Sequence, residues 1–178
     1  AGEAFGKVFR AAREALAQSG ADLVMVNNVV YNYGDSAVEV ANVRGTTSSA
    51  IVGNVFLRGL DSTTLPPVLV RGGYGEATLL SGSKVHVADN SNGSTPSEPW
   101  SLVNVEAPIA RSLVAADSAP LWPSGLVALP SGSVLNAVLA GAGARPGERD
   151  TADARVVDSV RNRTGRFVNC VSADGSDR

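Results

Sequence analysis

The sequence predicts an all-β fold with helices at both ends, and three observations support this prediction. Residues 22–105 consist of short β-branched runs separated by Gly, Asn, Ser and Thr turns, and no helical period persists there. Three of these runs end in an asparagine at the same inward phase. Helical spacing is confined to the two ends of the chain. Residues 1–178 are enough for a single domain with one sizeable core.

The first 20 residues predict a helix. Apolar residues recur at helical spacing over residues 3–18, and Gly20 suits the end of the helix. A stack of strands exposes an apolar end and unpaired strand edges. We expect the helix to cap that end with Phe5, Phe9 and Leu16.

Residues 21–105 are predicted to be strands and irregular loops. The runs LVMVNNVV, SAIVGNVF and KVHVADNS place Asn28, Asn54 and Asn90 at strand ends, in steps of 26 and 36 residues. In the third run Lys84 and His86 alternate with valines, which sets the outward and inward phases. The same phase predicts inward positions in all three runs for Leu23, Met25, Ile51, Val85 and Val87.

Two architectures fit this pattern of asparagines. In a coiled parallel array, like residues stack about 4.8 Å apart, so buried amides can hydrogen-bond to one another. In an ordinary sandwich, the asparagines would lie in hairpin turns. The pattern leaves both possibilities open.

Residues 106–130 are predicted to form an extended, proline-containing wrap, which Trp100 and Trp122 anchor on the strands. Residues 131–170 are predicted to form a helical tail of two helices. Ser131 or Ser133 would cap the first helix, which Gly141 and Gly143 end. Asp150 or Thr151 would cap the start of the second helix, and Gly165 would lie at its C′ position. Its apolar stripe is expected to be Val156, Val157 and Val160.

Composition excludes several classes of protein. The net charge of −2 gives no basic footprint for nucleic acid. No apolar run approaches the roughly 18 residues of a membrane span, so we expect no membrane partner. Cys170 is the single cysteine, which leaves no internal disulfide.

Several motifs together resemble a known family. The segment ADLVMVNNVVYNYGDSAVEVANVRGTTSSAIVGNVFLRG is similar to the C-terminal coils of bacterial and fungal pectate lyases, and KVHVADN followed by PWSLV resembles the next coil. The tail VLAGAGARPGERDTADARVVDSVRNRTGRFVNC resembles that of many bacterial members. The resemblance covers about residues 20–170. It implies a right-handed parallel β-helix with an N-terminal capping helix and a C-terminal helical tail.

The resemblance also implies a chemistry. The family cleaves polygalacturonate by β-elimination, in which calcium neutralises the uronate and an arginine takes the proton at C5. A secreted, monomeric polysaccharide lyase that degrades pectin is therefore expected.

The chain departs from the family at the catalytic residues. The family's calcium-binding aspartates precede the Asn-Asn coil, yet this chain has no aspartate before Asp22, so we expect the calcium site to be missing. Arg10 and Arg13 lie near the distance of the family's catalytic arginine, with Arg13 closer. The proline of that motif is absent, so both arginines also fit a solvated helix face. As it stands, the chain is expected to be a lyase or an inactive relative.

Other candidate sites and functions stay open. His86, the single histidine, is expected to be an outward strand residue, and Asp35, Asp61 and Asp89 could hold calcium only if they converge. One rival function is a non-catalytic carbohydrate-binding or structural module. Another is an unrelated all-β structural domain with a helical arm.

Overall fold

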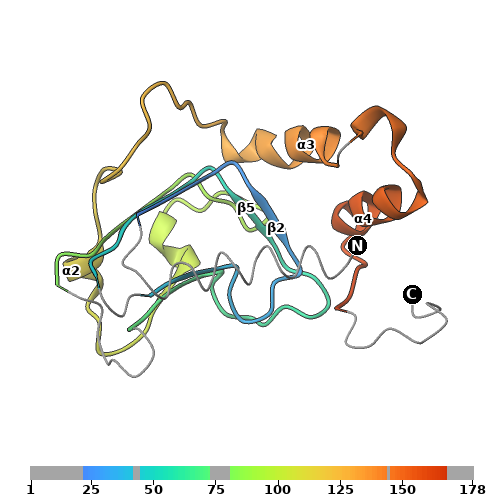
Figure 1. Cartoon of the computed structure of the whole chain (residues 1–178). Helices are drawn as coiled ribbons and strands as arrows, with labels where there is room; N and C mark the ends of the chain where they lie inside the picture. Colours follow the sequence, from blue (N-terminus) through green and yellow to red (C-terminus); the bar gives the residue numbers. More distant parts are fainter. Residues whose placement is uncertain (1–21, 42–44, 73–80, 144, 168–178) are drawn as a thin grey trace.

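The structure is a computed structural model that describes residues 22–41, 45–72, 81–143 and 145–167. The predicted helix of residues 3–18, with Arg10 and Arg13, lies outside the described residues, as does Cys170. Three small parallel sheets form the body, and helices cover part of it (Figure 1). Among the described residues, no helix has the length and apolar character needed to cross a membrane.

The strands recur in the same order along the chain and pair layer upon layer. The first layer contains β1 (Leu23–Val26), β2 (Val29–Tyr31) and β3 (Val38–Val40). The second contains β4 (Ser48–Val52), β5 (Val55–Leu57) and β6 (Val68–Val70). The third contains β7 (Lys84–Ala88) and β8 (Val103–Val105), with Ser91 bridging to Val55 between them. The sheets are β1-β4-β7, β2-β5 and β3-β6-β8.

The predicted register of the three asparagine runs is confirmed. Met25 pairs with Ile51, and Ile51 pairs with Val87, both in parallel. Every strand pairing among the described residues is parallel, so the antiparallel sandwich is wrong. The inward phase is also confirmed, because Ile51, Val85 and Val87 are buried in the core.

The expected all-β, right-handed parallel β-helix is wrong. The described strands form three separate sheets of three, two and three strands, and no sheet is curled or closed. The strands are three to five residues long, and left-handed residues interrupt the chain after β1 at Asn27 (φ 56°) and after β2 at Asn32 (φ 53°). These corners break each layer into short segments, so the described strands pair in three small separate sheets.

The adjacent residues Asn27 and Asn28 of the first layer have different structural roles. Asn27, Gly53 and Asp89 follow β1, β4 and β7, and all three adopt positive φ, which Gly, Asn and Asp tolerate best. The next residue in each layer is the column asparagine. A side chain at Gly53 would meet Asn27 Nδ2 at 2.6 Å, so that corner requires glycine.

The column predicted for Asn28, Asn54 and Asn90 is confirmed. Asn28 donates its backbone N–H and its Nδ2 to Asn54 Oδ1, at 3.0 and 3.1 Å. Asn54 donates the same two groups to Asn90 Oδ1, at 2.9 and 3.0 Å. Asn54 and Asn90 are almost fully buried, and these bonds supply the partners that buried amides need.

All three sheets contribute to one core. Phe56 is fully buried and packs with Val30, Val40, Ile51 and Val70. On the opposite face of β5, Val55 and Leu57 pack against Val134 of the first tail helix. The alternation of β5 therefore divides its side chains between the core and the helical cover.

The remaining segments differ in detail from expectation. The wrap contains a one-turn helix, α2 (Arg111–Val114), and short 3₁₀ turns occur at η1 (Pro99–Leu102) and η2 (Pro146–Glu148). Trp100 packs against the core and stacks under Arg111, 4.9 Å from ring centre to guanidinium, as an anchor should. The Trp122 indole donates within the wrap, to the Leu126 carbonyl.

Two tail helices form as predicted, with different ends. Helix α3 (Ser131–Gly141) begins after Pro130, and α4 (Thr151–Asn162) is capped by the Asp150 carboxylate. Helix α4 ends at Arg163 in the left-handed region, so Gly165 at the C′ position is wrong. Of the predicted stripe on α4, Val157 is buried and Val156 is exposed.

Replacing Asn54 with alanine should destabilise the protein by about 2–4 kcal/mol. The substitution removes the oxygen that accepts the Asn28 backbone N–H and the amide that donates to Asn90 Oδ1 and to the Met25 carbonyl, in a column whose second and third members are buried. Urea unfolding followed by circular dichroism measures the change. Asn92→Ala, in an exposed turn, is the control and should change stability by less than about 0.5 kcal/mol. An equal, small effect of both substitutions would contradict a structural role of the column.

Candidate anion-binding site at the Asp61 corner

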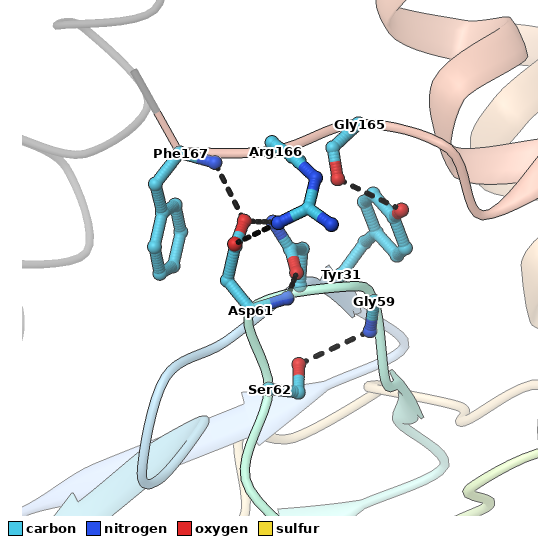
Figure 2. Close-up of polar contacts among 8 residues, drawn as sticks. Tyr31, Gly59, Asp61, Ser62, Gly165, Arg166 and Phe167 are labelled. Carbon is cyan, nitrogen blue, oxygen red and sulfur yellow. Dashed lines mark hydrogen bonds and ion pairs between the residues drawn. The ribbon is translucent and has the colours of Figure 1, made fainter. Parts of the chain in front are cut away.

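A cluster of polar and aromatic side chains lies where the end of the tail meets the turns after β2 and β5 (Figure 2). We call this cluster the Asp61 corner. It comprises Tyr31, Asn32, Asp61, Arg166 and Phe167. The first three come from the strand layers, and the last two come from the segment that follows α4.

The corner is built on Asn32, which adopts left-handed backbone geometry and is 5% exposed. Its Oδ1 accepts the backbone N–H of Asp61 at 2.9 Å, and its Nδ2 donates to the Asp61 carboxylate at 2.8 Å. A side chain at Gly59 would meet Asn32 Oδ1 at 2.4 Å, so glycine is needed there. The amide therefore fixes both the turn and the carboxylate.

Asp61 in turn holds the tail. The same carboxylate oxygen that accepts from Asn32 also accepts the Phe167 backbone N–H, at 2.6 Å. The other oxygen lies 3.4 Å from the Arg166 guanidinium. The Tyr31 hydroxyl donates to the Gly165 carbonyl at 3.3 Å, beside these contacts.

Electrostatics at the corner agree with this geometry. Hydrogen bonds from Asn32 and Phe167 stabilise the ionised carboxylate and hold the pKa of Asp61 below its ordinary value. Partial burial raises the pKa of the Tyr31 hydroxyl, and the negative charge of Asp61 acts in the same direction. Asp61 is therefore an anion committed to structural contacts, which makes it a poor general acid or base.

Two groups of the corner face solvent. The side chain of Arg166 is 65% exposed, and its contact with Asp61 is long. Phe167 is 54% exposed, and its ring approaches the turn at Gly34. A guanidinium can bind a carboxylate through two parallel hydrogen bonds, and an aromatic face accepts an apolar surface. The corner can therefore bind an anion that carries an apolar face.

The carboxylates proposed from sequence do not converge on a metal site. Asp61 is used by Asn32 and Phe167, while Asp89 accepts the backbone N–H and the hydroxyl of Ser131. Asp35 is exposed. Within the described ranges, no three His, Cys, Asp or Glu side chains are grouped to hold a metal ion. The three aspartates named from the sequence are therefore not gathered into a calcium site.

His86 lies on the outward phase of β7, as predicted. Its Nδ1 lies 3.0 Å from the Ala116 carbonyl, and neighbouring Lys84 donates to the Leu113 carbonyl at 2.9 Å. Both side chains therefore attach the wrap to the third layer.

Sequence reasoning missed Arg166 and Phe167 as site residues. They lie 105 and 106 residues from Asp61 and belong to no periodic pattern. The signals that the sequence offered for this cluster were the aspartate of the turn GLDS and the asparagine of the turn YNYG. These signals do not identify the segment that Asp61 binds.

Comparison of the chain with known protein families, with curated proteins and with solved structures found no match.

Acidification should weaken the attachment of the tail through Asp61. Because the folded-state pKa of Asp61 is lowered, its contribution is complete above the ordinary carboxyl pKa, near about pH 4. The contribution is lost as the pH falls through the lowered value. Thermal melts of the native protein and of Asp61→Asn, from neutral pH to below pH 4, should therefore converge at the acid end. Parallel curves throughout that range would contradict this role.

Proposed function

We propose that this chain binds an acidic polysaccharide of the polygalacturonate type without cleaving it. The single observation that carries the proposal is the pairing of the exposed Arg166 guanidinium with the exposed Phe167 ring at the Asp61 corner. A uronate residue carries a carboxylate and an apolar ring face. These are the two groups that an arginine and an aromatic ring bind together.

The charge of the corner supports an anionic ligand. Asp61 is already paired through its hydrogen bonds with the tail, and Arg163 lies close enough to Tyr31 to affect its ionisation. Two arginines thus flank Gly165 on the same segment, against one carboxylate. The Phe167 N–H bonds to the Asp61 carboxylate, which Asn32 holds in place. The backbone of this segment is therefore already ordered and loses little conformational entropy on binding.

Calcium-dependent cleavage of polygalacturonate is the second candidate. It rests on the resemblance of the strand and tail motifs to pectate lyases, and the order of the asparagine runs along the stack supports it. Arg13 and Arg10 stay the candidate bases of this proposal, with secretion and a monomeric state. The arrangement of the described carboxylates favours the binding module, because no metal-binding group occurs among them.

Removal of the exposed groups should weaken polysaccharide binding. Arg166→Ala and Phe167→Ala should each reduce affinity for sodium polygalacturonate about tenfold, which corresponds to about 1.4 kcal/mol. Isothermal titration calorimetry measures this change. Arg145→Ala, at an exposed arginine paired with Glu148 between the tail helices, is the matched control and should bind normally. Equal affinities of all three variants would contradict the site.

A cleavage assay separates the two candidates. β-Elimination creates a carbon–carbon double bond conjugated with the uronate carboxylate, so product formation raises ultraviolet absorbance. We expect no increase with polygalacturonate and calcium at protein concentrations that saturate binding. A calcium-dependent increase that Arg13→Ala abolishes would replace the binding module with the lyase.

A further inference from the structure

The outermost strands at the two ends of the strand stack differ in whether another segment hydrogen-bonds to their outer edge. At the third layer, Ala116 donates its N–H to the Val85 carbonyl at 2.9 Å, and Ala115 bridges to Val85. The wrap thus covers the outer edge of β7, and Asn90 is 1% exposed. At the first layer, β1 is the terminal strand of its sheet among the described residues, and Asn28 is exposed. The helix expected over residues 3–18 as a cap for this end lies outside the described residues, so a cap there is the alternative occupant that the experiment below tests.

The asparagine column has a direction that makes this open end specific. In each step, the earlier asparagine donates its N–H and Nδ2 to Oδ1 of the later one. Asn28 Oδ1 holds the equivalent acceptor position at the open end. Among the described residues no donor reaches it, whereas Asn54 Oδ1 and Asn90 Oδ1 each accept two hydrogen bonds.

The backbone of β1 has polar groups that face the same edge, and one of them, the Val26 carbonyl, also accepts Asn28 Nδ2 at 3.0 Å. Asn27 donates its N–H to the Val52 carbonyl, so odd-numbered residues of β1 direct their polar groups toward β4. Groups alternate along a strand, and Val24 and Val26 therefore direct theirs to the open edge. The inward side chains Leu23 and Met25 are only partly buried, whereas Ile51 in the next layer is fully buried.

We propose that this edge binds an extended peptide strand that carries an asparagine, added in parallel beside β1. The occupant repeats the interface already present between the layers. Its backbone pairs with Val24 and Val26, its inward apolar residues cover Leu23 and Met25, and its asparagine donates N–H and Nδ2 to Asn28 Oδ1. Main-chain pairing supplies affinity, and the amide sets register and specificity. This surface is separate from the Asp61 corner.

A synthetic peptide tests the proposal. The peptide SSAIVGNVFLRG copies residues 48–59, whose asparagine is already a donor in the column. A fluorescently labelled peptide should bind the whole chain saturably, measured by anisotropy. The same peptide with aspartate in place of asparagine lacks the amide donor and should bind at least about tenfold more weakly. Absence of saturable binding, or equal binding of the two peptides, would overturn the proposal.

A variant of the protein places the binding on β1. Val24→Pro removes an N–H that faces the open edge, and proline is tolerated at that side of an edge strand. It should reduce peptide affinity about tenfold or more, whereas the matched Val24→Ala should bind as the native chain does. Circular dichroism establishes that both variants fold. Unchanged peptide affinity in folded Val24→Pro would place the peptide elsewhere.

Discussion

The hydrogen bonding of buried amides is the constraint on which the rest of this structure depends. Asn54 is fully buried, and a buried amide without partners costs several kcal/mol. Its amide bonds to Asn28, to Asn90 and to the Met25 carbonyl of the first layer, and these contacts require parallel strands in exact layer-to-layer register. One column therefore determines strand direction and register, and hence which side chains face the core.

The left-handed residues that precede the column asparagines attach the strand layers to the wrap and the tail. Asn27 precedes the column asparagine of the first layer, and its side chain exchanges two hydrogen bonds with Leu129 of the wrap. Asp89, at the same position in the third layer, holds Ser131 at the start of α3. The left-handed corners thus turn the chain inside each layer and also attach the segment that leads to the helices (Figure 1).

The Asp61 corner completes that attachment and places two exposed groups, a guanidinium and an aromatic ring, side by side at the surface. The same contacts that position the tail commit Asp61 to hydrogen bonding and leave Arg166 and Phe167 facing solvent. Asp61 therefore supports the structure, while Arg166 and Phe167 are the residues available to contact a ligand. This division favours a binding role over an acid–base role for the corner, because its hydrogen bonds hold the pKa of the Asp61 carboxyl below the ordinary value.

The sequence by itself determined the features that depend on local periodicity and backbone preference. It predicted the strands, the inward phase of Ile51 and Val87, the asparagine column and the two tail helices, because each has a short-range pattern. Only the tertiary structure decided that the sheets stay separate and unclosed, and that Arg166 and Phe167 meet Asp61 across more than 100 residues. The arrangement of the sheets depends on how the turns between strands direct the chain, and the Asp61 corner depends on where the tail docks. Neither quantity is encoded in any single stretch of the chain.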